Sequence, residues 1–419
     1  MAMMMAWRWA ALLCGLLSAI IVGADPAFVG SAVNGSLVLQ PADGQAVLIA
    51  GADFRALVDT VKRQDEALKL QAESVEKLQQ QAAALTQQLD RPKCTPAADT
   101  TSMKGMTAVS KWAGGVLAGN GKIYGIPYLS NSVLIIDPTT DTADTTTIAS
   151  TGVSGDIKWW GGVLAPNGKI YGIPRRSTAV LIIDPATNTV DTTSITGLTG
   201  DHKWLGGVLA PNGKIYGIPH SARPVLILDP ATNATDVSTM IVTAGDGKWA
   251  EGVLAANGKI YGMPYFSTSV LIIDPKTNVA DETSIVGLTG IEKWVGGVLA
   301  RSGKIYAIPF TASSVLIIDP ATNAVDTATL VIAATSGNFE GGVLANNGKI
   351  FAIPMQSSSV LIVDPATNTT DRTTVTSLST GNSKWLGGVL ARNGKIYGIP
   401  FGSPSVLVLL SQCLLVGGL

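Results

Sequence analysis

The segment KWLGGVLAPNGKIYGIP, residues 203–219, recurs with small changes along the chain. Close copies begin at six other positions: Lys111, Lys158, Lys248, Lys293, Asn338 and Lys384. The aromatic residue that follows each start recurs every 45 to 47 residues, at Trp112, Trp159, Trp204, Trp249, Trp294, Phe339 and Trp385. A period of this size is typical of β-propeller blades or of solenoid repeats.

Each repeat contains four candidate strands. GGVLA is the first, and the NG pair after it suits a tight hairpin turn in which the backbone needs positive φ. KIYGIP and SVLIID follow as the second and third strands, and DPATN is a turn with Asp first and Pro second. DTTSI is the fourth, and its polarity suits an outer edge. Four short strands per unit favour a propeller blade.

The two ends of the repeat array predict a closed ring. Residues 99–112, DTTSMKGMTAVSKW, match residues 191–204, DTTSITGLTGDHKW, in length, opening and ending. The seventh repeat stops after its third strand, SVLVLL. An orphan fourth strand at one end therefore complements a missing fourth strand at the other, whereas an open solenoid would need polar caps. We predict an all-β fold: a seven-bladed β-propeller over residues 99–410, closed by an N-terminal outer strand.

The segments outside the repeats have distinct characters. Residues 1–24 read as a signal peptide, with Arg8 before an apolar run; an uncleaved anchor is the alternative. Residues 25–53 form a predicted short β and linker segment, and residues 411–419 an apolar tail. Three sequons, at Asn34, Asn233 and Asn368, agree with secretion or display at the cell surface.

Residues 54–91 predict a coiled-coil stalk. Phe54, Val61, Leu68, Val75, Ala82 and Leu89 recur every seven residues. A narrow apolar seam of this kind suits another helix, so we expect self-association as a dimer or trimer. A single amphipathic helix packed on a globular core is the alternative.

The repeat resembles a known family. APNGKIYGIPRRSTAVLIIDPATNTV, residues 165–190, is similar to the YVTN-type propeller repeat and more distantly to the NHL repeat. The order of the hairpin, the extended Tyr, the VLIID strand and the ATNTV segment is shared, but YGIP stands where the family's tetrapeptide is expected. The resemblance covers residues 99–410 and implies a propeller used for binding and surface display.

Composition excludes several function classes. The 419 residues carry a formal net charge of −1 and only 14% are charged, so no nucleic-acid partner is predicted. Three cysteines and two histidines form no ligand cluster, so we predict no metal and no cofactor. General acid–base and nucleophilic catalysis both need paired groups within reach, and the GGVLA strand offers none. We therefore expect a protein that is not an enzyme.

Candidate ligand-binding residues come from the loops around the first strand. In a propeller this strand lies nearest the axis, and the loop entering it shares a face, here the top face, with the loop after the second strand. The repeats differ most on this face, and variable loops on a uniform scaffold often carry recognition. The candidates are Trp112, Tyr128, Trp159, Arg175, Arg176, Trp204, His220, Trp249, Tyr265, Phe266, Trp294, Phe310, Trp385 and Phe401.

These candidates leave alternatives open. The tryptophans serve either as packing between blades or, beside the lysines that precede them, as stacking surfaces for sugars or anionic polymers. Glu251 and Glu340 are acids near the axis that nothing in the sequence brings together. The predicted function is a secreted or cell-surface multivalent protein that binds glycans or extracellular proteins. The alternatives are a propeller hydrolase or lyase of the lactonase kind, or a structural matrix or wall component.

Overall fold

The computed structural model describes residues 28–33, 36–41, 47–49, 54–89, 95–332, 339–379, 381 and 383–411. The chain divides into two compact units, Met1–Pro92 and Lys93–Leu419. The predicted signal peptide, the sequon at Asn34 and all but the first residue of the apolar tail lie outside the described residues.

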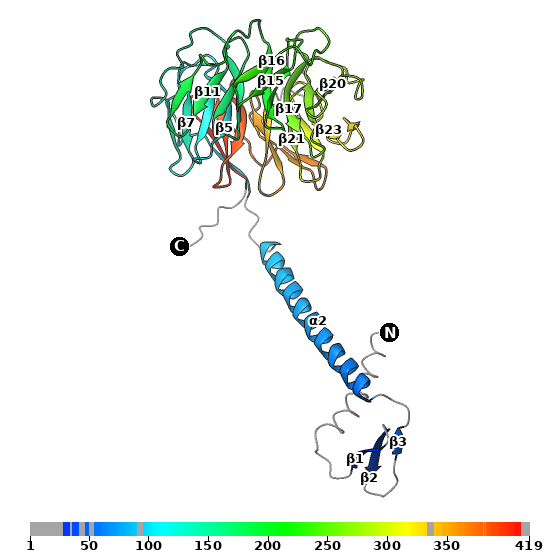
Figure 1. The fold of residues 1–419 in the computed structure, drawn as a ribbon. Helices are drawn as coiled ribbons and strands as arrows, with labels where there is room; N and C mark the ends of the chain where they lie inside the picture. The colour runs from blue at the N-terminus through cyan, green and yellow to red at the C-terminus, as the bar shows by residue number, and fades with distance from the viewer. Residues whose placement is uncertain are drawn as a thin grey trace. The chain divides into compact units, whose positions relative to one another are not determined.

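The first unit contains a small sheet and one long helix. Strands β1 (Phe28–Val33), β2 (Ser36–Pro41) and β3 (Val47–Ile49) pair antiparallel in the order β1-β2-β3. Helix α2 runs without a break over Phe54–Leu89 (Figure 1). Its seam residues Leu68, Val75 and Leu78 are 61%, 52% and 63% exposed. Self-association through this seam stays a prediction.

None of the helices in the described ranges has the length and apolarity needed to cross a membrane.

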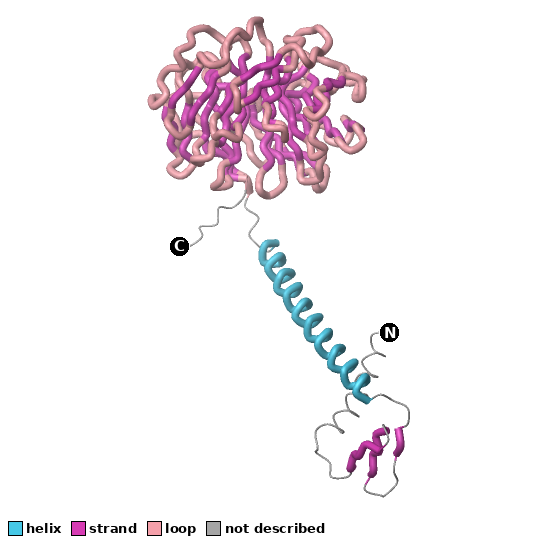
Figure 2. Tube along the Cα trace, viewed as in Figure 1, coloured by secondary structure: helices cyan, strands magenta, loops and turns pink. Residues whose placement is uncertain are grey.

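The second unit is a seven-bladed β-propeller, and in its described residues every blade is a four-stranded antiparallel sheet (Figure 2). The first strands are β5 (Trp112–Leu117), β9 (Trp159–Leu164), β13 (Trp204–Leu209), β17 (Trp249–Leu254), β21 (Trp294–Leu299), β25 (Phe339–Leu344) and β29 (Trp385–Leu390). The second strands are β6 (Ile123–Pro127), β10 (Ile170–Pro174), β14 (Ile215–Pro219), β18 (Ile260–Pro264), β22 (Ile305–Pro309), β26 (Ile350–Pro354) and β30 (Lys395–Pro400).

The outer half of each blade completes the sheet. The third strands are β7 (Leu134–Asp137), β11 (Leu181–Asp184), β15 (Leu226–Asp229), β19 (Leu271–Asp274), β23 (Leu316–Asp319), β27 (Leu361–Asp364) and β31 (Leu407–Leu410). The fourth strands are β8 (Thr142–Asp144), β12 (Thr189–Asp191), β16 (Ala234–Asp236), β20 (Val279–Asp281), β24 (Ala324–Asp326), β28 (Thr369–Asp371) and β4 (Ala97–Asp99). Blades 1 to 7 are numbered by their first strands, β5 to β29.

The fourth strand lies earlier in the repeat than the sequence predicted. DTTSI was expected to be extended, but β12 ends at Asp191, its first residue. The Asp191 carboxylate accepts hydrogen bonds from the backbone N–H groups of Thr193 (2.7 Å) and Ser194 (3.0 Å). An aspartate that bonds the backbone two and three residues later favours a turn over a ladder. The chain therefore bends where the polar run begins.

The predicted ring closure is confirmed. Strand β4 completes blade 7 by pairing with β31, with Asp99 opposite Val408 and Ala97 opposite Leu410. The strand begins two residues before the predicted boundary at 99. Met103, which follows it, is buried against Trp112 of blade 1. In Figure 1 the early cyan strands and the late red strands of the propeller stand side by side.

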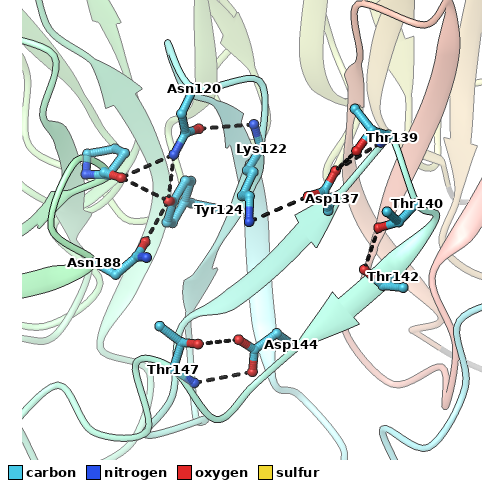
Figure 3. A network of polar contacts seen from close by, with 11 residues as sticks. Asn120, Lys122, Tyr124, Asp137, Thr139, Thr140, Thr142, Asp144, Thr147 and Asn188 are labelled. Atoms are coloured by element: carbon cyan, nitrogen blue, oxygen red, sulfur yellow. Dashed lines mark hydrogen bonds and ion pairs between the residues drawn. The ribbon is translucent and has the colours of Figure 1, made fainter.

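Tyrosines of the second strands join neighbouring blades on the bottom face, which carries the NG and DPATN turns. The Tyr124 hydroxyl of blade 1 donates to Asn188 Oδ1 of blade 2 at 2.8 Å (Figure 3). Asn120 Nδ2 donates to the Tyr124 hydroxyl and to the carbonyl oxygen of Pro185. The turn residues thus hold blades together, which explains why the bottom turns vary so little from one repeat to the next.

Candidate functional site

The first strands crowd around the axis because glycine occupies their third position. A Cβ on Gly114 would lie 3.2 Å from Gly161 Cα of the next blade, and one on Gly387 would lie 3.2 Å from Gly114 Cα. These glycines also have positive φ, 78° at Gly114, which side chains disfavour. Blade 4 alone departs from this pattern, since Glu251 fills the position with φ 61°.

Two further rings of residues surround the axis on the top face. The axial ring is formed by the second residue of each first strand: Ala113, Trp160, Leu205, Ala250, Val295, Glu340 and Leu386. The loop ring is formed by the residue after each second strand: Tyr128, Arg175, His220, Tyr265, Phe310, Met355 and Phe401. Their apolar members pack into one cluster. We call the two rings together with Glu251 the axial mouth.

Backbone hydrogen bonds fix the loop ring. The N–H of Tyr128 donates to the carbonyl oxygen of Lys111 in its own blade at 2.8 Å. The N–H of Lys158 in the next blade donates to the carbonyl oxygen of Tyr128 at 3.0 Å. This pattern confirms that the loop before the first strand and the loop after the second are neighbours on one face.

Arg175 is the cation of the mouth. Its guanidinium carbon lies 4.5 Å from the centre of the Trp160 ring and 5.9 Å from that of Tyr128, within range of cation–π attraction. Tyr128 in turn packs against Trp160 at 5.5 Å and against Phe401 at 5.2 Å. The cation is thereby held over aromatic faces, with its charge available to the acids nearby.

A second aromatic group covers blades 3 to 5. Tyr265 packs edge-on against His220, at 5.7 Å between ring centres, and against Phe310 at 6.0 Å. Burial and the charge of the nearby Glu292 carboxylate raise the pKa of Tyr265. Burial, together with the charge of Arg175, lowers the pKa of His220 to about 3. His220 is therefore a neutral imidazole at physiological pH.

The structure brings Glu251 and Glu340 together, which the sequence gave no reason to expect. Burial raises the pKa of Glu251 to about 6, and a hydrogen bond with the Trp160 side chain opposes that rise. Burial and the charge of Glu251 raise the pKa of Glu340 well above its ordinary value, while Arg175 opposes the rise. Two acids and one arginine from three blades thus meet at the axis.

Two polar groups of the mouth lack a partner. Among the described residues, four buried side-chain nitrogen or oxygen atoms have no hydrogen-bond partner, and two of them are Arg175 Nε and His220 Nδ1. His220 is only 7% exposed. Buried polar atoms without a hydrogen-bond partner are unusual in proteins. A ligand group that forms the missing hydrogen bond is one explanation for them.

The tryptophans among the predicted ligand residues lie elsewhere. Trp112, Trp159, Trp204, Trp249, Trp294 and Trp385 are 0% to 4% exposed. Each indole N–H donates to a carbonyl oxygen twenty residues on, as Trp159 does to Ala179 at 2.8 Å. The idea that these indoles form an exposed stacking surface is therefore wrong in this structure. They pack between blades, as the alternative interpretation had it.

The lysines before these tryptophans are also structural. Lys203 is 2% exposed, and its Nζ donates to the carbonyl oxygens of Ser177 and Gly200 at 3.0 Å and of Arg175 at 3.2 Å. Burial lowers the pKa of Lys203 to about 8. The Lys203 ammonium group is buried and already donates its hydrogen bonds to backbone carbonyl oxygens. It therefore offers no exposed positive charge to an anionic polymer.

Other predicted residues lie at the edge of the mouth or away from it. Arg176 is exposed and its Nε lies 3.3 Å from Asp201 Oδ1. Phe266 is 39% exposed and packs on Tyr265 at 4.8 Å. Of the sequons, Asn368 is exposed, whereas Asn233 is half-buried and accepts a hydrogen bond from the Tyr171 hydroxyl. No group of three or more His, Cys, Asp or Glu that could hold a metal occurs within the described ranges.

Several solved structures have a similar fold. A streptogramin B lyase structure aligns with 75% of this chain and 97% of its own, with a TM-score of 0.62 and 13% identity. A catalytically inactive virginiamycin B lyase from Staphylococcus aureus, solved with quinupristin, aligns with 75% and 99%, with a TM-score of 0.62 and 8% identity. The extracellular domain of a hybrid two-component system from B. thetaiotaomicron aligns with 92% and 46%, with a TM-score of 0.56 and 9% identity.

No protein-family model and no curated protein matches the sequence. At these identities the structural likeness shows the propeller fold alone.

Sequence reasoning missed part of the mouth. Trp160 was not predicted as a site residue, and Glu251 and Glu340 were noted without a role. The signal that finds them is departure from the repeat. Trp160 and Glu340 stand where other blades carry Ala, Val or Leu, and Glu251 stands where every other blade carries Gly.

Proposed function

We propose that the protein is a secreted or cell-surface binding protein whose ligand, a glycan or an extracellular protein, binds at the axial mouth. The observation that carries this proposal is the pair of buried polar atoms without partners, Arg175 Nε and His220 Nδ1, inside a ring of aromatic side chains. Ligand sites are typically apolar and aromatic with a few placed polar groups, and the mouth has this composition.

The resemblance to YVTN-type and NHL-type repeats supports the proposal, since such propellers are used mainly for binding and display. Self-association through helix α2 would bring several propellers into one oligomer. If its exposed seam, including Leu68 and Leu78, joins two or three chains, avidity raises modest single-site affinity by about 10²–10⁴ where the geometry permits.

A glycan array and a panel of extracellular proteins, probed with residues 25–419, test the function. We expect Tyr265→Ala with Phe266→Ala, and Arg175→Ala with Arg176→Ala, to reduce capture without unfolding the propeller. Each change removes aromatic or charged surface from the top face.

The matched control lies on the bottom turn of the same blade as Tyr265. Lys276 and Thr277 are both exposed there, so Lys276→Ala with Thr277→Ala should leave capture intact. Thr187 and Asn188 are a poorer choice, because Asn188 bonds Tyr124 of the preceding blade. If Lys276→Ala with Thr277→Ala abolished capture while both top-face variants still bound the ligand, the site would lie on the bottom face and the assignment to the top face would be wrong.

A second candidate function is a propeller hydrolase or lyase. The observation that favours it is the pair of half-buried Glu251 and buried Glu340, whose pKa values are both raised, a property common at catalytic sites. Turnover of lactone and polysaccharide panels by the wild type, abolished in Glu251→Gln, would establish it. Binding without turnover on those panels would favour the first proposal.

A further inference from the structure

Glu251 and Glu340 both occupy positions where the repeat places a residue better suited to the fold. Glu251 holds φ 61° in the ring of axial glycines, a backbone region in which a side chain is strained, and such strain often marks functional sites. Glu340 is 5% exposed among Ala, Val and Leu. A buried acid in apolar surroundings is costly unless it is well paired.

The Glu251 side chain extends along the glycine ring. Its Cγ lies 3.0 Å from the Cβ that Gly206 of blade 3 would carry, and its Oε2 lies 2.6 Å from the Cβ that Gly296 of blade 5 would carry. That same Gly296 Cβ would be 3.0 Å from Gly341 Cα, the residue after Glu340. The Glu251 carboxyl therefore lies among the axial glycines, one residue beyond the axial ring along the first strands, and we call this position the floor of the mouth.

The acids share this floor with groups from other blades. The Trp160 side chain of blade 2 lies near enough to Glu251 to oppose the rise of its pKa. Glu340 interacts through charge with Arg175 of blade 2, Tyr128 of blade 1 and Tyr265 of blade 4. Residues of blades 1, 2, 4 and 6 thus lie close together around the axis, with the axial glycines of blades 3 and 5 beside them.

The hydrogen-bonding groups of the mouth are mixed. Arg175 Nε–H is a donor without a partner, His220 Nδ1 is a neutral nitrogen without a partner, and the Tyr128 hydroxyl both donates and accepts. The carboxyl groups of Glu251 and Glu340 accept hydrogen bonds, and either one donates as well when it carries a proton. A carboxylate on the ligand would be repelled by the charge of the two acids, and an ammonium group on the ligand would be repelled by Arg175. The set suits a ligand whose groups each donate and accept, that is, hydroxyl groups.

We propose that Glu251 and Glu340 are ligand-binding residues that select an uncharged sugar, held by hydrogen bonds from its hydroxyl groups at the floor of the mouth and by stacking on its aromatic rim. This inference rests on the proposed binding function and narrows its ligand. It also explains why two costly acids stand in place of glycine and an apolar residue, since binding groups are commonly kept at the expense of stability.

Variants that restore the repeat test this proposal. Glu251→Gly installs the residue of the other six blades, and Glu340→Val installs the residue found at Val295. We expect each variant to raise Tm by about 2–4 °C, because strain or a buried acid is removed. We expect each to weaken binding of neutral oligosaccharides by about tenfold or more, because a hydrogen-bonded charge or carboxyl is lost.

The probe is a panel of matched neutral, uronic-acid and amino oligosaccharides, titrated calorimetrically into residues 25–419. Asp246→Asn, an exposed acid in a top-face loop before blade 4, is the matched control and should bind as the wild type does. Preference for neutral sugars, lost in both restored variants, supports the inference. A lower Tm in Glu251→Gly, or unchanged sugar binding in both variants, overturns it.

The outcomes also separate this inference from the proposed function. Tighter binding of uronic-acid or amino sugars, or capture of proteins alone, overturns the neutral-sugar assignment while Tyr265→Ala with Phe266→Ala still reduces capture. Neutral-sugar binding that is insensitive to that pair and to both restored variants places the ligand outside the mouth and overturns both.

Discussion

The Tyr397 hydroxyl of blade 7 donates a 2.6 Å hydrogen bond to Asp141 Oδ1 of blade 1. Lys395, on the same strand as Tyr397, forms an ion pair with the other carboxylate oxygen of Asp141. The last and first blades are thus joined on the bottom face by a charged contact, in addition to the β4–β31 ladder that completes blade 7. At the seam Tyr397 bonds a carboxylate, whereas Tyr124, Tyr171 and Tyr261 bond the side-chain amides of Asn188, Asn233 and Asn323 at three other junctions.

Tyr397→Phe should destabilise the propeller by about 1.5 to 3 kcal/mol, because a hydrogen bond to a charged group is lost at the seam. Phenylalanine fits this position, since blade 6 carries Phe351 there. Tyr306→Phe is the matched control and should cost less, because no carboxylate hydrogen bond is removed. Denaturant unfolding of both variants gives the comparison, and equal losses would show that the seam contact has no special weight.

Deleting residues 93–105 should lower Tm by far more than a surface change does. The deletion removes β4 from the edge of β31 and takes the buried Met103 away from Trp112. Deleting residues 36–49, which lie in the other unit, is the control and should leave the propeller transition in place. An unchanged Tm after the first deletion would count against closure by the N-terminal strand.

The acids of the mouth predict a pH dependence. The pKa of Glu251 is raised from 4.5 to about 6, so the folded state holds a proton that the unfolded state releases. Its contribution to stability is complete below about pH 4.5 and is lost as pH rises through about 6. The Tm advantage of Glu251→Gly over the wild type should therefore grow between pH 4.5 and 7. A difference that stays constant over this range would show that Glu251 does not titrate there.

Residues 25–419 should form an oligomer through helix α2. Light scattering at micromolar concentration should give a dimer or trimer, and Leu68→Glu with Val75→Glu should give a monomer, because charges at seam positions oppose helix pairing. Gln80→Glu lies outside the seam and should leave the oligomer intact. A monomeric wild-type protein would show that helix α2 does not mediate self-association and that the protein does not bind multivalently.

The repeat fold was predictable because every unit carries the same signals. The NG turn and the Asp-Pro turn each occur in six of the seven repeats, and the match between residues 99–112 and 191–204 links the two ends of the array. The position of the fourth strand could not be predicted from polarity. The segment DTTSI, residues 191–195, has strand-forming residues, but the hydrogen bonds of the Asp191 carboxylate to the backbone that follows make it bend.

The site was predictable only in outline. The loop ring, including Arg175, His220 and Tyr265, was found from its variability, and backbone hydrogen bonds between blades show that it neighbours the loops before the first strands. The sequence does not show which tryptophans are buried between blades, because burial depends on the tertiary structure. Residue type alone therefore could not distinguish the six repeated tryptophans from Trp160, which lies in the axial mouth. The meeting of Glu251 with Glu340 depends on ring geometry, which brings residues 89 positions apart to one axis.

The central claim is that the ligand occupies the axial mouth, and Trp160 emission reports on it most directly. Trp160 lies in the mouth, whereas the six tryptophans that begin first strands are buried between blades. Titrating residues 25–419 with the neutral oligosaccharide that binds most strongly on the array should shift the tryptophan emission, and Trp160→Phe should abolish the shift. An oligosaccharide that binds the wild type without changing its emission, or a shift that survives in Trp160→Phe, would contradict the account.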